Sequence, residues 1–137
     1  MRKIAVSGGF DPIHIGHVRM IREASQFGDV IVIANSDSWL RRKKGYVFMP
    51  YEERAEILMS IKGVTEVHIG IDDDDTVCES LRRIRPSAFA NGGDRKKNNT
   101  PEMDVCNDLG IEMMWNTGGT KLQSSSDLVS NARQGVE

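Results

Sequence analysis

The sequence predicts an α/β fold, a Rossmann-like, doubly wound sheet of about five parallel strands with helices on both faces. Short apolar segments rich in valine and isoleucine alternate with helix-like segments along the chain. Residues 29–35 are apolar almost throughout, which is typical of a strand buried on both faces. The 137 residues contain no internal repeat, low-complexity tract or linker, so we expect a single domain over residues 1–137.

The expected strands lie at residues 3–6, 29–35, 64–69, 88–90 and 111–115. Because helices separate them, the strands should run parallel to one another. Ligands of such sheets bind beyond the carboxyl ends of the strands, where the strand order reverses. The turn that follows the first strand should therefore lie at the ligand-binding edge.

The expected helices begin and end at recognisable signals. Gly28 ends the helix expected at residues 17–27, as glycine commonly does just past a helix C-terminus. Pro50 opens the next helix, whose first turn is acidic, where negative charge is favoured. Residues 36–48 are polar and basic, and we expect a loop there with about one helical turn. Further helices are expected at residues 76–83, from 100 to Gly110, and after the serine-rich segment 124–127.

Composition excludes several classes of function. The net charge is −2, so no global attraction to nucleic acid or to an anionic membrane is expected. No apolar run approaches the length of a membrane span, and no signal peptide precedes the first strand, so we expect a cytoplasmic protein. Cys78 and Cys106 have no metal-ligand spacing and are expected to be reduced thiols.

The segment from Gly8 to His17 carries the clearest chemical signal. A glycine turn at the end of a strand brings backbone N–H groups close to an anion, and the next helix adds its positive N-terminus. His14 and His17 can face one pocket from the first helical turn. This arrangement favours phosphate chemistry. His68, by contrast, lies on an expected strand without a motif, and we expect a structural role for it.

Gly9-Phe10-Asp11 with His14-Ile15-Gly16-His17 resembles the HxGH signature of the nucleotidyltransferase superfamily. This superfamily includes cytidylyltransferases, heptose-1-phosphate adenylyltransferases and pyridine-nucleotide adenylyltransferases. The resemblance covers nearly the whole chain. It includes Asn35-Ser36-Asp37, Lys43 and Lys44, Pro50 with Glu53-Arg54, Gly92-Gly93-Asp94 and Ser124-Ser125-Ser126.

Two subfamilies are most similar. The Asn-Ser-Asp and Gly-Gly-Asp segments resemble heptose-1-phosphate adenylyltransferase domains, whereas the short length is similar to glycerol-3-phosphate cytidylyltransferases. The latter usually carry an arginine shortly before the terminal serine–threonine cluster. Here residues 118–123 contain no arginine, and Lys121 would have to take its place.

The resemblance implies that an acceptor phosphate attacks the α-phosphorus of CTP or ATP and that pyrophosphate leaves. The acceptor would be a sugar phosphate, a polyol phosphate such as glycerol 3-phosphate, or a phosphonate. Mg²⁺ would be bound mainly through the nucleotide phosphates, with no dedicated metal ligands in the protein, and a homodimer is expected. Two alternatives stay open: an adenylyltransferase of the nicotinate-mononucleotide type, and a nucleotide-binding regulator without turnover.

The resemblance also implies roles for individual residues. His14 and His17 would donate hydrogen bonds to the triphosphate, and Lys44 or its neighbour Lys43 would bind the acceptor phosphate. Asp11, on the acceptor side, would either help to hold magnesium or fix the loop by hydrogen bonds. The residues expected to bind the nucleotide are Ser7, Gly8, Gly9 and Phe10 in the turn, Gly93 and Asp94 at the ribose or base, and Ser124, Ser125 and Ser126 at the β- and γ-phosphates.

Overall fold

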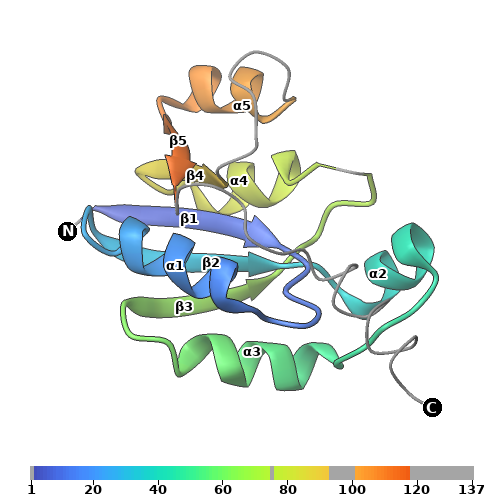
Figure 1. Cartoon of the computed structure of the whole chain (residues 1–137). Helices are drawn as coiled ribbons and strands as arrows, with labels where there is room; N and C mark the ends of the chain where they lie inside the picture. Colours follow the sequence, from blue (N-terminus) through green and yellow to red (C-terminus); the bar gives the residue numbers. More distant parts are fainter. Residues whose placement is uncertain (1, 75, 93–100, 118–137) are drawn as a thin grey trace.

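A computed structural model describes residues 2–74, 76–92 and 101–117, and within them it shows one parallel five-stranded sheet in the order β3-β2-β1-β4-β5 (Figure 1). The strands are β1 Lys3–Gly8, β2 Asp29–Ala34, β3 Val64–Ile69, β4 Ala88–Gly92 and β5 Glu112–Thr117. The predicted α/β class and the parallel sheet are confirmed. The third predicted strand has the bounds that the structure shows, and the others differ by one or two residues at one end or, for the fifth, at both ends.

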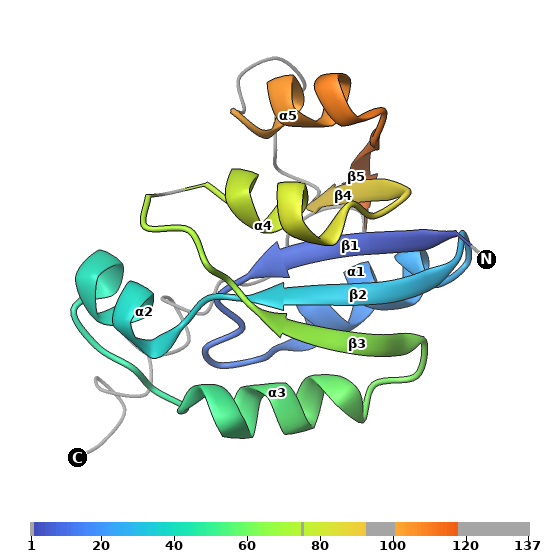
Figure 2. The same cartoon turned by 180° about the vertical axis from the view of Figure 1, so that it is seen from behind.

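The helices cover both faces of the sheet, as expected of a doubly wound fold. They are α1 Ile15–Ala24, α2 Asp37–Lys44, α3 Tyr51–Met59, α4 Cys78–Ile84 and α5 Glu102–Leu109. Helices α1 and α3 lie on one face, and α4 and α5 lie on the other (Figures 1 and 2). Each face has its own apolar cluster, one including Ile21 of α1 and Leu58 of α3, the other Leu81 of α4 and Val105 of α5.

The strand order reverses between β1 and β4, which places the ligand-binding edge beyond the ends of these strands. β1 and β2 pair in continuous register from Lys3 opposite Asp29 to Gly8 opposite Ala34. The two strands therefore end side by side, and the N–H of Asn35 donates to the Gly8 carbonyl at 3.0 Å. The turn after β1 and the turn after β2 are adjacent as a result.

The loop predicted at residues 36–48 is wrong in its main part, because residues 37–44 form the helix α2. Its ends are well defined. The Ser36 side chain caps the first turn by accepting the N–H of Trp39 at 3.1 Å, and Gly45 ends the helix in the left-handed conformation at φ +85°. Leu40 is the buried residue of α2, so the helix has little of the apolar periodicity that would have predicted it.

Two other predictions about helices have different outcomes. The helix expected from residue 100 starts at Glu102 and ends before Gly110, which adopts φ +71° as predicted for a glycine beyond a helix C-terminus. The helix expected after residues 124–127 lies outside the described residues. Among the residues that the structure describes, no helix is both long enough and apolar enough to cross a membrane.

Candidate active site

The turn after β1 forms the floor of the candidate site. Ser7, Gly8 and Gly9 are half-buried, whereas the Phe10 side chain is packed into the core with 1% exposure. Phe10 has φ +53°, a left-handed conformation that costs free energy for a residue with a side chain. Gly9 lies against α2, because a Cβ at this position would be 3.1 Å from Leu40 Cδ2. The main chain is therefore tightly constrained where nucleotide binding is expected.

The two histidines of the motif share one hydrogen-bonded arrangement at the start of α1. His14 is the N-cap residue, and its Nδ1 accepts the N–H of Gly16 at 3.0 Å. The Nδ1 atom of His17 accepts the N–H of His14 at 3.2 Å. The rings stack with centroids 3.8 Å apart and an interplanar angle of 26°. Both residues are half-buried, and these hydrogen bonds hold their rings in place.

These hydrogen bonds define the tautomer of both rings. An imidazole nitrogen that accepts an N–H cannot itself carry a proton, so the proton of the neutral ring is assigned to Nε2. His14 and His17 are each in this state, since each accepts a backbone N–H at Nδ1. Each ring consequently carries an N–H donor at Nε2, a group that is suited to phosphate oxygens. Helix capping and phosphate binding are therefore compatible functions of the same side chains.

Asp11 is completely buried and holds the segment that precedes α3. Its two carboxylate oxygens accept the N–H groups of Phe48, at 2.7 Å, and Met49, at 2.5 Å. Of the two roles expected for this residue, the structure shows the contacts that fix the loop. Its assignment to acceptor binding remains a prediction.

Lys44 is the lysine of the basic run that lies beside the turn. Its Nζ would be 3.9 Å from a Cβ at Gly9. Lys44 follows Leu40 by one turn of α2, so the two side chains share the face that points toward Gly9. Lys44 is half-buried, whereas Lys43 is exposed. The geometry favours Lys44 over Lys43 as the residue that meets an anion at this turn.

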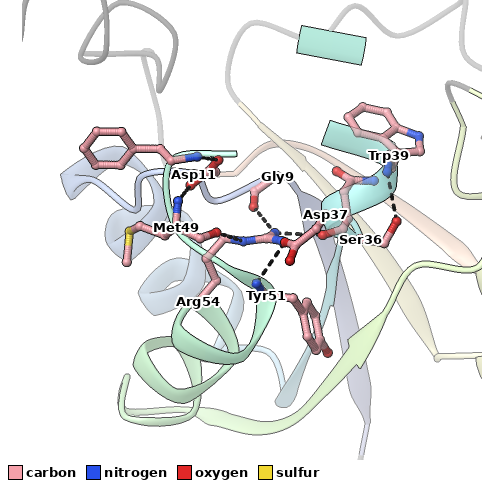
Figure 3. A network of polar contacts seen from close by, with 10 residues as sticks. Gly9, Asp11, Ser36, Asp37, Trp39, Met49, Tyr51 and Arg54 are labelled. Carbon is pink, nitrogen blue, oxygen red and sulfur yellow. Dashed lines mark hydrogen bonds and ion pairs between the residues drawn. The ribbon is translucent and has the colours of Figure 1, made fainter. Parts of the chain in front are cut away.

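Sequence reasoning did not identify Arg54 as part of the site. Its side chain is fully buried and donates hydrogen bonds to Gly9, Asn35, Asp37 and Met49 (Figure 3). The family resemblance included Arg54 only as part of a helix. No local signal distinguishes this arginine from an exposed one, since its acceptors come from other parts of the chain.

Several predicted residues are not placed by the structure. Gly93, Asp94, Ser124, Ser125 and Ser126 lie outside the described residues, as does Lys121. His68 is placed on β3, where its Nε2 lies 2.8 Å from Glu66 Oε1. Two hydrogen bonds lower the pKa of the Glu66 carboxyl below its ordinary value. The one with His68 has the larger effect, and the one with Lys3 has the next largest. His68 thus has a structural partner apart from the glycine turn.

The fold and the site together define a nucleotide-binding α/β protein with an HxGH motif at the switch point of its sheet. Residues 5–129 match the family described as cytidylyltransferase-like, and the chain belongs to this family. The predicted membership in the nucleotidyltransferase superfamily is confirmed.

Relatives with related sequences include two kinds of protein. The bifunctional protein HldE of Geobacter sulfurreducens is 35% identical over 96 residues, which are 68% of this chain and 19% of that protein. The FAD synthase of Thermococcus kodakarensis is 34% identical over 95 residues, which are 68% of this chain and 63% of that protein. The chain thus spans about a fifth of the first relative and less than two thirds of the second.

A solved structure supports the fold independently. The lipopolysaccharide core biosynthesis protein from Thermoplasma volcanium superimposes with a TM-score of 0.73 over 90% of this chain and 99% of that chain. The two sequences are 21% identical, so the likeness shows a shared fold.

Proposed function

We propose that this protein transfers a nucleoside monophosphate from a nucleoside triphosphate to a phosphorylated small molecule and releases pyrophosphate. The observation that carries the proposal is the pair of imidazoles, His14 and His17, whose Nδ1 atoms are both occupied by backbone N–H groups. The two rings, each with an Nε2–H donor, lie at the N-terminus of α1, where a triphosphate is favoured.

In the proposed reaction an oxygen of the acceptor phosphate attacks the α-phosphorus of the triphosphate. A new P–O bond forms, the bond between the α-phosphorus and its bridging oxygen breaks, and pyrophosphate leaves with the electron pair. Catalysis of this kind depends on positioning and on stabilising charge that develops in the transition state. The imidazole N–H groups of His14 and His17 donate hydrogen bonds to the triphosphate. The Lys44 ammonium offsets the electrostatic repulsion between the triphosphate and the acceptor phosphate.

Mg²⁺ fits this site through the nucleotide rather than through protein ligands. Among the described residues, the groups that we assign to the phosphates are N–H and ammonium donors, which bind phosphate oxygens and do not ligate a cation. Each oxygen of Asp11 already accepts a backbone N–H. When bound to the triphosphate, Mg²⁺ would neutralise part of the phosphate charge.

ATP is the proposed donor. The relative named FAD synthase makes a product that contains an adenylyl group, and the Asn-Ser-Asp and Gly-Gly-Asp segments resemble heptose-1-phosphate adenylyltransferases. The family description, cytidylyltransferase-like, supports CTP as the second candidate. For the acceptor we propose a sugar phosphate, a polyol phosphate or a phosphonate. By analogy with the family we also propose a homodimer, and from the composition we propose that it works in the cytoplasm.

A pyrophosphate-release assay tests the proposal. The purified protein is incubated with Mg²⁺ and either ATP or CTP, together with sugar 1-phosphates, glycerol 3-phosphate, simple phosphonates, nicotinate mononucleotide or riboflavin phosphate. We expect release with ATP and one of the first three classes. Release with nicotinate mononucleotide would support the alternative adenylyltransferase, and nucleotide binding without release for any acceptor would favour the regulator.

Substitution of one histidine makes the assay specific. His17→Ala should lower the rate about 100- to 1000-fold, since it removes one phosphate donor. His68→Ala is the matched control because His68 contacts Glu66 on β3, and its rate should equal that of the wild type. Equal rates for His17→Ala and the wild type would contradict the assignment of this site.

A further inference from the structure

Arg54 joins three loops at the carboxyl edge of the sheet, one of which is the glycine turn expected to bind the nucleotide. It lies in the first turn of α3, and its side chain has 0% exposure. The hydrogen bonds are Nε to Met49 O at 2.9 Å, Nη1 to Gly9 O and to Asn35 O at 2.7 Å each, and Nη2 to Asp37 Oδ1 at 2.7 Å. The acceptors thus belong to the turn after β1, the turn after β2 and the loop before α3 (Figure 3).

A buried arginine is a costly way to gain stability. Transfer of the guanidinium from water is unfavourable, and well-packed apolar residues often replace buried ion pairs without loss of stability. What the guanidinium does provide is a rigid planar fork of donors with fixed directions. At Arg54 this fork fixes three backbone carbonyls and one carboxylate relative to one another. The arrangement is better suited to setting geometry than to strengthening the core.

One side of the fork fixes the glycine turn. Since the peptide bond is planar and trans, its C=O and N–H point in opposite directions. The carbonyl of Gly9 points to Arg54, and the N–H of Phe10 in the same peptide unit therefore points away from it. The hydrogen bond from Arg54 to the Gly9 carbonyl therefore accounts for the orientation of a peptide unit that is expected to bind phosphate.

The Nη2 group of Arg54 fixes the start of α2, the helix that carries Lys44. Asp37 is the first residue of α2, and its Oδ1 accepts from both Arg54 and the N–H of Tyr51, the latter at 2.9 Å. Helix α2 ends with Lys44, whose Nζ lies beside Gly9. Arg54 thus contacts both the turn after β1 and the first residue of α2. The same helix places the Lys44 ammonium beside that turn.

We propose that Arg54 is a positioning residue that holds the glycine turn and α2 in one geometry, and so sets the place of the Lys44 ammonium relative to the bound triphosphate. The guanidinium itself does not touch substrate. The consequence for substrate binding depends on the proposed function, whereas the mechanical coupling of the turn to α2 does not.

Two variants on α3 separate positioning from stability. Arg54→Lys keeps the charge but replaces the planar fork by a single ammonium, which cannot reach four acceptors in their present directions. Leu58→Ala is the matched control. Leu58 lies one turn further along α3, is fully buried, and packs in an apolar cluster that also contains Phe10, but it forms none of the polar contacts that Arg54 makes with the turns. Both variants should lower the thermal midpoint, and all comparisons are made well below both midpoints.

Hydrogen exchange of the full chain tests the coupling directly. In Arg54→Lys the peptides that cover residues 8–12 and 36–49 should both exchange about tenfold faster than in the wild type, because their shared anchor is gone. In Leu58→Ala the change should be confined to α3 and the apolar cluster, which includes Phe10, so residues 36–49 should exchange as in the wild type. Faster exchange only within α3 of Arg54→Lys would overturn the proposal.

Titration with ATP and Mg²⁺ tests the consequence for binding. Arg54→Lys should bind about 10- to 100-fold more weakly than the wild type, as expected for a displaced anion site, and Leu58→Ala should bind like the wild type. An equal loss of affinity in both variants would overturn positioning in favour of a purely structural role. If the wild type binds neither ATP nor CTP, the proposed function fails, and the exchange experiment alone decides whether Arg54 couples the two segments.

Discussion

The imidazole of His14 folds back over Gly16: its Nδ1 accepts the Gly16 N–H at 3.0 Å, and a Cβ at Gly16 would lie 2.9 Å from its Cε1. The glycine between the two histidines is therefore required by the ring of the first. Because His17 in turn accepts the N–H of His14, the orientation of both donors depends on this close approach.

Gly16→Ala should displace the His14 ring while the helix remains. We expect transfer activity to fall about 10- to 100-fold, because the donors are misplaced. The free energy of unfolding should change by no more than about 1 kcal/mol, since the better helix propensity of alanine offsets the weakened cap. Activity assays and urea denaturation measure the two effects. Arg22→Ala, an exposed change on the same helix, is the control, and equal activities of the two variants would contradict the requirement.

Lys44 and Lys43 are neighbours in sequence but differ in their surroundings. Lys44→Met should lower kcat/KM for the acceptor about 10- to 100-fold, because a cation beside the anionic reactants is removed. Lys43→Met makes the same substitution at an exposed side chain. Its kcat/KM for the acceptor should stay within about twofold of the wild-type value. Steady-state kinetics at low ionic strength compare the two. A larger effect at Lys43 would assign the acceptor phosphate to that residue instead.

Asp11 should contribute strongly to stability. In Asp11→Ala the N–H groups of Phe48 and Met49 lose their acceptors, which should cost about 2–5 kcal/mol of the free energy of unfolding. Asp11→Asn keeps one acceptor oxygen and should lose less. Urea denaturation measures these differences, with the exposed Asp73→Ala as a control that should change stability by less than about 0.5 kcal/mol. Similar midpoints for Asp11→Ala and the control would show that these hydrogen bonds contribute little.

Cys106 should make the protein less stable in alkaline solution. Burial, assisted by the nearby Glu102 carboxylate and Cys78, raises the pKa of the Cys106 thiol from 9.0 to about 11. Between these values the folded protein holds a proton that the unfolded chain releases. The free energy of unfolding should therefore fall as pH rises through this interval, by up to about 1.4 kcal/mol per pH unit.

Denaturation at pH 8, 9.5 and 10.5 measures the alkaline loss, because the first value lies below the unfolded pKa of 9.0 and the other two lie between it and the folded pKa of about 11. The variant Cys106→Ala is the control, since it should lose this part of the dependence. Burial also raises the pKa of the half-buried Cys78 thiol. In the folded protein at pH 8 both thiols should thus react slowly with a disulfide reagent, and rapid modification of Cys106 would contradict its burial.

The strands and the histidine motif could be predicted because their signals are local. The strand at residues 64–69 was predicted with the bounds that the structure shows, and the glycine turn with His14 and His17 indicated phosphate binding before any contact was known. Helix α2 was missed because its stability does not come from an apolar stripe. Ser36 and Gly45, its two capping residues, were the available signals.

The sequence by itself determined the α/β class, the order of its strands along the chain, and the motif that identifies the family, since these depend on patterns within a few residues. The tertiary structure alone decided that Arg54 is buried at the junction of three loops and that Lys44 stands beside Gly9. The physical reason is that a buried charge is acceptable only where acceptors from distant parts of the chain converge on it. Such convergence is a property of the folded arrangement of β1, β2 and α3, and no short segment of the sequence contains it.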